Sequence, residues 1–350
     1  MNRYPDFFHA HFVDSFALYG ILLNRFTSVN EFDQRAETRK IFVLGSLNAD
    51  LVQRVARLPL SGETIAGEEL QMFAGGKGAN QACAAARLGG RVAMAGRVGN
   101  DAFGARLRAE LEECGVDTRR VETCPTTTGA ATILVLPSAE NVIVISPGAN
   151  GTVTAAAGID AVSEGQPGDL LLCQLEVPLE ANIAALQAAR GRGMIGILDP
   201  APASILPEEM LSVVSILIPN QTEAAAVLGR SGREIESVDA ARDLAAELLR
   251  VGPEVVIIKL GRLGCLVARA GESVAVAGHS VTAIDTTAAG DTFSGALAAE
   301  LSRGKELLEA VRFANAAAAL CVTKAGAIDS IPALADVNEF LERQRGDKVA

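Results

Sequence analysis

Short runs of apolar, often β-branched residues alternate with longer helix-like stretches from residue 40 onward. The runs include KIFVLGSL at 40–47, DLLLCQLE at 169–176 and EVVIIKLG at 254–261. Continuous apolar runs of this length are typical of strands buried on both faces, whereas DAARDLAAELLRVG at 239–252 has helical spacing. Strands that alternate with helices of this kind predict a parallel sheet covered by helices on both faces.

Two segments, 47–75 and 127–147, interrupt this alternation. The second largely coincides with TGAATILVLPSAENVIVISPG (128–148), in which strand-like runs are joined by turn residues with no helix between them. This pattern predicts a small antiparallel sheet inserted into the larger domain. An appendage of this kind beside a ligand crevice is expected to act as a lid.

Residues 1–39 differ in composition from the rest of the chain. They hold six of the twelve phenylalanines and both tyrosines, without the strand–helix alternation. A short amphipathic helix is predicted near 8–24, and we interpret the stretch as an N-terminal extension of unknown role. The main domain is then expected over 40–345, with a short tail over 346–350.

Size and charge narrow the possible functions. The 350 residues suit two ordinary domains or one large α/β domain with an insertion, and the 49% hydrophobic content suffices for a large core. With a formal net charge of −11, we expect no nucleic-acid or membrane partner, because an acidic protein gains nothing from counterion release. Apolar runs such as FALYGILL at 16–23 are too short to span a bilayer. Nothing resembles a secretory signal, so we expect a cytoplasmic location.

The cysteines and histidines indicate a reducing compartment and limit the choice of catalytic base. Six cysteines are scattered without a CxxC pair, which is typical of buried free thiols in a reducing compartment. The three histidines are His9, His11 and His279, and the first two are interpreted as incidental members of the extension. A Ser-His-Asp triad or a histidine-rich metal site is thus nearly excluded, so a catalytic base is expected to be a carboxylate.

Two motifs near the first strand indicate a polyol site. In GSLNADLV, Asn48 and Asp50 follow the strand, where a parallel sheet faces its ligand crevice, and together they can bind vicinal hydroxyls. In FAGGKGANQA, glycines around Lys77 open a helix whose N–H groups suit oxygen ligands. The spacing matches neither a Walker motif nor a dinucleotide fingerprint. The alternatives are an Asx turn for the first motif and a plain strand-to-helix turn for the second.

Three further stretches follow predicted strands; two of them supply polar groups and the third supplies glycines. Glu176 ends the strand QLE, and Asn220 and Glu223 lie three residues apart at a helix start, where a carboxylate and an amide suit Mg²⁺ through water. Helix capping explains the second pair equally well. In IKLGRLGCLV, Gly261 and Gly264 allow close approach of a flat or phosphorylated ligand, or simply form a turn.

The stretch AIDTTAAGDTFSGAL, residues 283–297, is the most informative. Its small residues before Asp291 leave the first N–H groups of a helix uncovered, which together with the helix dipole form an anion hole. A carboxylate beside such a hole, able to accept a hydroxyl proton, is the equipment of phosphoryl transfer. Asp285 is expected to bind a cation or to fix the loop. The alternative for Asp291 is a simple helix N-terminal charge.

Taken together and in this order, the motifs resemble those of the ribokinase-like carbohydrate and nucleoside kinases, the phosphofructokinase-B type, over about residues 40–345. The shared motifs are GSLNAD, GGKGANQA, VGNDAFG, QLE, PAPA, PNQTEA, DTTAAGDTFSGAL, RFANAAAAL and KAGAIDSIP. VGNDAFG and DTTAAGD are similar to the family as a whole, whereas NAD, GGKGAN and QLE are similar to its ribokinases. The resemblance implies a three-layer, Rossmann-like αβα domain with a mostly parallel central sheet and a small β lid that also forms a homodimer contact.

The resemblance further implies ATP-dependent phosphorylation of D-ribose at its 5-hydroxyl, with Mg²⁺ and an activating K⁺. Implied sugar contacts are Asn48, Asp50, Gly76, Lys77, Asn80 and Glu176. The implied catalytic base is Asp291, with an anion hole at Ala288, Ala289 and Gly290. Implied ATP contacts are Asn220, Lys259, Leu260, Gly261, Arg262, Leu263, Gly264, Gly290, Asp291 and Asn315. The implied Mg²⁺ residue is Glu223 together with Asn220, and the implied K⁺ loop comprises Asp285, Thr287, Cys321, Lys324, Gly326 and Ser330.

Two residues depart from the family pattern. Asp199 stands in ILDPAPA where an asparagine is expected, and Gln221 stands where glutamate is common. Neither changes Asn220 or Glu223, so the chemistry is expected to survive. Three alternatives stay open: a kinase for deoxyribose, fructose or a nucleoside; a non-catalytic sugar- or nucleotide-sensing protein on the same fold; and, more weakly, a dinucleotide-binding oxidoreductase.

Overall fold

The computed structural model describes residues 38–138, 140–230 and 237–346. The predicted extension therefore lies outside the described residues except for Arg39 and the residue before it, and so do its helix, both of its histidines and the tail beyond residue 346. In the described part of the chain, no helix has the length and apolarity needed to cross a membrane.

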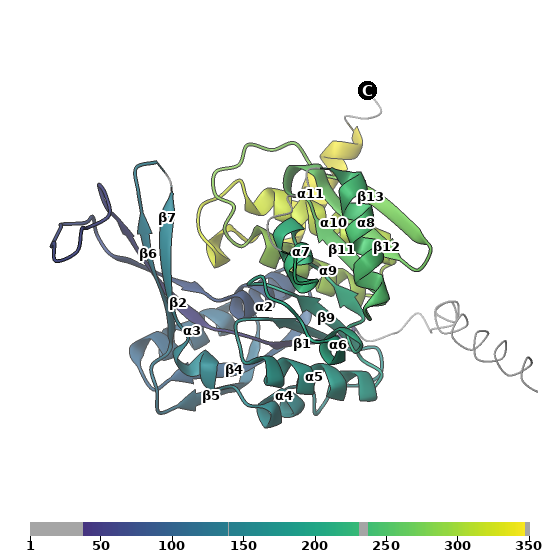
Figure 1. The fold of residues 1–350 in the computed structure, drawn as a ribbon, viewed down its shortest axis with the longest axis horizontal. Helices are drawn as coiled ribbons and strands as arrows, with labels where there is room; N and C mark the ends of the chain where they lie inside the picture. Colours follow the sequence, from purple (N-terminus) through teal and green to yellow (C-terminus); the bar gives the residue numbers. More distant parts are fainter. Residues whose placement is uncertain (1–37, 139, 231–236, 347–350) are drawn as a thin grey trace, which may run out of the picture. The chain divides into compact units, whose positions relative to one another are not determined.

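A nine-stranded sheet forms the centre of the molecule (Figure 1). Side by side, its strands are β13 (Glu272–Ala277), β12 (Gly264–Arg269), β11 (Val255–Lys259), β10 (Ile216–Leu217), β9 (Ile195–Asp199), β8 (Leu170–Gln174), β1 (Lys40–Leu44), β4 (Arg91–Gly99) and β5 (Asp117–Cys124). From β11 to β5 every pairing is parallel, and β12 and β13 add an antiparallel hairpin at one edge. The predicted mostly parallel sheet is confirmed.

Helices cover both faces of this sheet because its strands are apolar on both sides. In β1, Ile41 and Val43 point into one hydrophobic core and Phe42 and Leu44 into the other, as the period-two geometry of a strand requires. The first core is closed by α2 (Lys77–Arg87), α3 (Ala102–Glu113), α9 (Ala289–Ser302), α10 (Leu307–Cys321) and α11 (Leu334–Gly346). The second is closed by α4 (Ala155–Ala161), α5 (Leu179–Gly191), α6 (Glu208–Leu211), α7 (Gln221–Val227) and α8 (Val238–Arg250). The three-layer prediction is confirmed.

A second, four-stranded sheet stands beside the first and is the predicted lid (Figure 1). Its order is β3 (Gln71–Gly75), β2 (Asn48–Arg54), β6 (Gly129–Val135) and β7 (Asn141–Ser146). Each hairpin, β2 with β3 and β6 with β7, is antiparallel as predicted, but the central pairing of β2 with β6 is parallel. The reason is topological: β2 continues from β1 and β6 follows β5, so both leave parallel strands of the large sheet in the same direction.

Polar residues collect at the carboxyl ends of the large sheet, on the side from which the lid strands leave. Asp199 ends β9, Lys259 ends β11, Asn220 follows β10, and Ser46 and Glu176 follow β1 and β8. In open α/β sheets, ligands bind in the crevice outside these strand ends. A ligand site is therefore expected at this edge of the sheet.

Candidate active site

A cavity of about 640 Å³ lies at this edge of the sheet. The predicted site residues that line it are Lys77, Asn220, Glu223, Lys259, Gly261, Arg262, Gly264, Ala288, Ala289, Gly290, Asp291 and Asn315. Two residues from the implied ATP stretch lie elsewhere: Leu260 is buried in the core and Leu263 is exposed. The cavity thus joins the strand ends, the turn after β11 and the start of α9.

The start of α9 has an unusual backbone. Ala288, at the N-cap, has φ 59° and ψ 6°, and it is the one non-glycine residue of the described chain with positive φ. This left-handed conformation costs an alanine roughly 1–2 kcal/mol. The N–H of Ala289 makes a long bond of 3.3 Å to the carbonyl of Thr286, while among the described residues those of Gly290 and Asp291 have no acceptor. Two open N–H groups therefore face the cavity at the positive end of a 14-residue helix.

Asp291 lies beside these open groups and is held by two amides. It is only 6% exposed, and its Oδ2 accepts from Nδ2 of Asn80 at 2.9 Å while its Oδ1 accepts from Nε2 of Gln81 at 3.0 Å. Both amides lie in the first turns of α2, which packs closely against α9: a Cβ at Gly295 would lie 2.6 Å from that of Ala84. The carboxylate is thus fixed in orientation by two neutral donors, as a proton acceptor requires.

Gln81 also connects Asp291 to Asp199. Its Nε2 donates to Oδ2 of Asp199 at 3.1 Å, its Oε1 accepts from Nε2 of Gln174 at 2.6 Å, and Ser294 donates to the same Asp199 oxygen at 3.0 Å. All four of these partners are buried. Sequence reasoning noted Asp199 only as a departure from the family pattern and did not select Gln81, although the latter stands inside the quoted motif GGKGANQA.

Two of the six predicted sugar contacts, Asn48 and Glu176, line a neighbouring cavity of about 310 Å³ together with Ile145 of β7. Lys77 lines the larger cavity, and Asp50, Gly76 and Asn80 line neither of the two. Asn48 is fixed because its Oδ1 accepts from Nδ2 of Asn150 at 2.7 Å. Asp50 lies two residues along the same lid strand. Burial is the main cause that raises its pKa to about 7, and the charges of Glu176 and Asp291 add to it. Hydroxyl groups of a ligand that donate to this carboxylate would favour its ionised form and so lower the pKa again.

Glu176 connects this cavity to the start of α2. Its Oε2 accepts from the hydroxyl of Ser46 at 2.5 Å and from the backbone N–H of Lys77 at 3.0 Å. The Lys77 ammonium is buried, which alone would lower its pKa, but the carboxylates of Asp291, Asp199, Glu176 and Glu223 outweigh burial and raise it. Lys77 is therefore a fixed positive charge between four acids.

The glycines of the GGKG segment are required by close packing. Gly76 has φ 91°, and a Cβ there would lie 2.8 Å from the backbone nitrogen of Asn48 and 2.9 Å from the carbonyl oxygen of Ser46. A Cβ at Gly78 would lie 2.6 Å from the backbone of the strand-end residue Gly45. The start of α2 is thus pressed against the GSLNAD segment, which brings the two predicted sugar motifs together.

Asn220 and Glu223 form a complete capping box at the start of α7. The side chain of Asn220 accepts from the N–H of Glu223 at 2.8 Å, and Oε2 of Glu223 accepts from the N–H of Asn220 at 2.7 Å. Burial is the main cause that raises the pKa of Glu223; Lys259 opposes it and Asp199 reinforces it. Both residues line the cavity, and carboxylate and amide oxygens retain second lone pairs. The pair therefore fits an Mg²⁺ held through water, while capping, the alternative from the sequence, is also present.

The residues of the implied K⁺ loop converge from two segments. The two carboxylate oxygens of Asp285 accept from the N–H groups of Thr287, at 2.9 Å, and Gly326, at 3.0 Å. Burial alone would raise the pKa of Asp285, but these hydrogen bonds outweigh burial and lower it. The thiol of Cys321 lies 3.7 Å from the Thr287 carbonyl and 3.0 Å from the Ser330 hydroxyl. Lys324 takes part through its backbone N–H, bonded to the Cys321 carbonyl.

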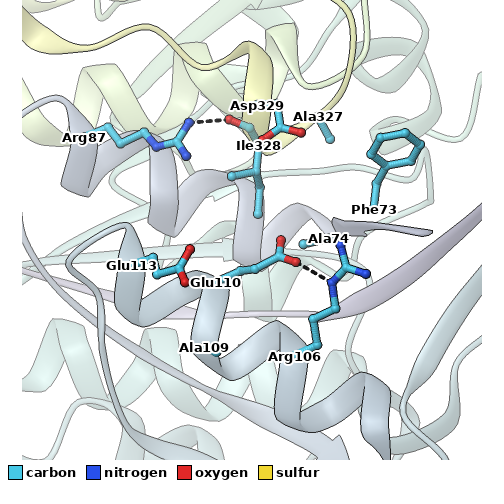
Figure 2. A pocket seen from close by; sticks show the side chains of 10 residues that line it. All are labelled: Phe73, Ala74, Arg87, Arg106, Ala109, Glu110, Glu113, Ala327, Ile328 and Asp329. Atoms are coloured by element: carbon cyan, nitrogen blue, oxygen red, sulfur yellow. Dashed lines mark hydrogen bonds and ion pairs between the residues drawn. The ribbon is translucent and has the colours of Figure 1, made fainter. Parts of the chain in front are cut away.

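A separate cavity of about 380 Å³ lies behind this loop, between α2, α3 and the end of β3 (Figure 2). Figure 2 shows Arg87 extended toward the loop, where it donates to the carbonyl of Ile328 at 2.5 Å, and Arg106 paired with Glu110 at 2.7 Å. Arg106 also donates to the carbonyl of Met72 in the lid, at 3.2 Å. Sequence reasoning did not select these arginines, which brace the loop and the base of the lid.

An open helix start beside a fixed carboxylate, next to a small cavity that Asn48 and Glu176 line, is the arrangement required of a phosphotransferase that acts on an alcohol group. The chain belongs to the pfkB family of carbohydrate kinases, whose profile matches residues 38–334.

Relatives extend this family assignment. The chain is 42% identical over 305 residues to a ribokinase of Haemophilus influenzae, covering 87% of this chain and 99% of that protein. It is 42% identical over 309 residues to a ribokinase of Schizosaccharomyces pombe, covering 85% of this chain and 96% of that protein. The structure of Arabidopsis thaliana ribokinase complexed with ribose and ATP superposes with a TM-score of 0.81 at 34% identity, over 87% of this chain and 99% of that one.

Proposed function

We propose that this protein transfers the γ-phosphoryl group of ATP to the 5-hydroxyl of D-ribose, which yields ribose 5-phosphate and ADP. The observation that carries the proposal is Asp291, a buried carboxylate oriented by two amides beside the open N–H groups of α9. Ribokinases at 42% identity over nearly their whole length support ribose as the sugar.

The proposed reaction begins with both substrates in the crevice. Ribose lies between the Asn48–Asp50 strand and the GGKG segment, with Glu176 at the strand end. The triphosphate lies along the larger cavity, with its terminal phosphate at the start of α9. Ile145 on β7 lines the sugar cavity, so closure of the lid over ribose would exclude water from it.

In the chemical step, Asp291 accepts the proton of the 5-hydroxyl as that oxygen attacks the γ-phosphorus in line. The bond between phosphorus and the bridging oxygen of ADP breaks at the same time. The N–H groups of Gly290 and Asp291 donate to the oxygens on which negative charge develops. When Mg²⁺ is bound with ATP near Asn220 and Glu223, it supplies charge neutralisation on the phosphates.

We further propose K⁺ as an activating ion at the loop of Asp285, Thr287, Cys321 and Ser330, where carbonyl, hydroxyl and carboxylate oxygens suit a hard cation. The domain limits of 40–345, a homodimer formed through the lid and a cytoplasmic location complete the proposal. All six cysteines are free thiols, which suits a reducing compartment.

The test is a coupled assay of ADP release with ribose, deoxyribose, fructose and adenosine, with and without K⁺. Ribose is expected to give the highest kcat/KM, and Asp291→Asn to lower kcat about 10²–10⁴-fold, the range for loss of a general base. Asp239→Asn is a matched control, because this exposed acid also lies in the first turn of a helix, α8.

Three outcomes would contradict the proposal. Unchanged turnover of Asp291→Asn would refute the role of the base and leave it a helix-terminal charge. A preference for another sugar would favour a related kinase. Ribose binding without ADP release would favour the non-catalytic sensing protein.

A further inference from the structure

Lys259 and Asp199 form an ion pair on the wall of the larger cavity. The Nζ of Lys259 donates to Oδ1 of Asp199 at 2.9 Å, and the two side chains are 15% and 2% exposed. They end β11 and β9, on either side of β10 in the sheet. Both line the cavity that contains the start of α9.

The ammonium group of Lys259 lies above the first turn of α9. A Cβ added at Gly290 would be only 3.4 Å from its Nζ. An ammonium has three N–H bonds, and in the described part of the chain one of them is directed to Asp199. Two N–H bonds therefore remain for a ligand, at the place where the open N–H groups of Gly290 and Asp291 also point.

Asp199 explains why a lysine is needed there. An unpaired carboxylate at this position, beside the phosphates, would repel them. The carboxylate of Asp199 cannot turn away, because Gln81 and Ser294 hold its second oxygen. The lysine balances the charge of this group and in return is fixed by it.

We propose that Lys259 contacts the phosphoryl group in transfer and acts as a catalytic residue, and that Asp199 is the residue that positions it. The inference deepens the function proposed above and rests on it. As the 5-hydroxyl attacks, negative charge spreads over the equatorial phosphoryl oxygens, and the ammonium donates hydrogen bonds to them without giving up a proton.

The first test compares Lys259→Met with the wild type, using Lys305→Met as the control because Lys305 forms an exposed pair with Glu309 outside the site. Lys259→Met is expected to lower kcat about 10²–10³-fold, the usual loss for one donor to a developing charge. The KM for ribose should stay within about twofold of the wild-type value, since the sugar contacts are untouched.

Calorimetric titration without sugar supplies a second readout. Lys259→Met should weaken binding of the imido analogue of ATP by about tenfold, corresponding to one lost charge-assisted contact to the terminal phosphate, and leave ADP binding nearly unchanged. Equal loss for both nucleotides, or an unchanged kcat, would overturn the inference. Because this titration needs no sugar, it remains decisive for Lys259 even if the wild type phosphorylates no sugar and the proposed function fails.

The double variant Lys259→Met/Asp199→Asn tests the role of Asp199. Lys259→Met alone leaves a buried carboxylate facing the phosphates, and the second change removes that charge. We expect the double variant to regain about fivefold to tenfold in kcat over Lys259→Met, a non-additive result, while staying below the wild type. No regain in kcat would refute the charge-balancing role, and a melting temperature measured for each variant separates this effect from loss of folded protein.

Discussion

Asp50 shows how a single residue of the sugar site makes stability depend on pH. Its pKa is about 7 in the folded, ligand-free protein and near 3.8 for an unperturbed aspartate. A raised pKa in the folded state means that the folded protein holds the proton more tightly than the unfolded chain. The stabilisation is therefore complete below pH 4 and is lost as the pH rises through 7.

Asp50→Asn should remove this dependence. Relative to the wild type, we expect the variant to gain free energy of unfolding as the pH rises from 5 to 8, by at most about 3 kcal/mol, because about two of the roughly three pKa units of the shift lie above pH 5. Urea denaturation of the ligand-free protein at several pH values measures the difference. A gap between the two proteins that is the same at pH 5 and pH 8 would contradict the pKa assigned to Asp50.

The sequence could predict those site residues whose role depends on their neighbours in the chain. It could not predict residues whose role depends on contacts between distant segments. Asp291 was selected because the small residues before it stand next to it in the chain. Gln81 was missed, since its contacts to Asp199 and Asp291 join residues more than 100 positions apart. Ser46, which donates to Glu176, stood inside a quoted motif but had no partner in view.

Among the elements, the start of α2 gives the sharpest prediction, because a matched control exists. Gly76 and Gly62 have similar backbone angles, φ 91° and φ 80°, but a Cβ at Gly62 would meet no atom within 4 Å. Gly62→Ala should therefore cost only the backbone strain, about 1 kcal/mol. Gly76→Ala should cost several kcal/mol more, as overpacking against backbone does, and raise the KM for ribose.

Denaturation curves and ribose kinetics for the two glycine variants measure these effects. An equal loss of stability in both would show that the close approach of α2 to Ser46 and Asn48 is unimportant. Gly62 lies in the lid segment between β2 and β3, so a change of ribose KM confined to Gly76→Ala would also locate the effect at the start of the helix.

The type and order of the elements followed from the sequence, whereas their pairing did not. The alternation of apolar runs and helices determined the three layers. The parallel contact of β2 with β6 joins segments about 80 residues apart, and no local pattern reports it. Likewise, β10 is only two residues long, because the chain turns into the cap of α7 directly afterwards.

For the whole molecule, the lid carries the evidence for the proposed homodimer. All of β7 is exposed, including Val142, Ile143, Val144 and Ile145. Ile145 lines the sugar cavity, and Ile143 shares its face of the strand. Val142 and Val144 lie on the opposite face, which no ribose could cover, so a second copy of the chain is the expected partner.

Val144→Lys should therefore convert a dimer into a monomer, as measured by light scattering after size-exclusion chromatography. Val144 is 62% exposed, so the substitution should leave the folded subunit intact. Ile205→Lys is the control, because Ile205 is 70% exposed but lies outside the lid. A wild type that is monomeric at all concentrations, or a Val144→Lys protein that remains dimeric, would contradict the proposed interface.

The pairing of lid strand β2 with β6 bears on how the proposed kinase would limit hydrolysis of ATP in the absence of sugar. Asn48 and Asp50 belong to the lid strand β2, and Asn48 pairs directly with Gly129 at the foot of β6. Outward movement of the lid would carry these two of the six proposed sugar contacts with it, so the acceptor site would be incomplete while the lid is open. A pentose is large enough to contact the lid strand and the start of α2 at once, whereas a water molecule is not. Hydrolysis of ATP by water should therefore be slow in the absence of sugar.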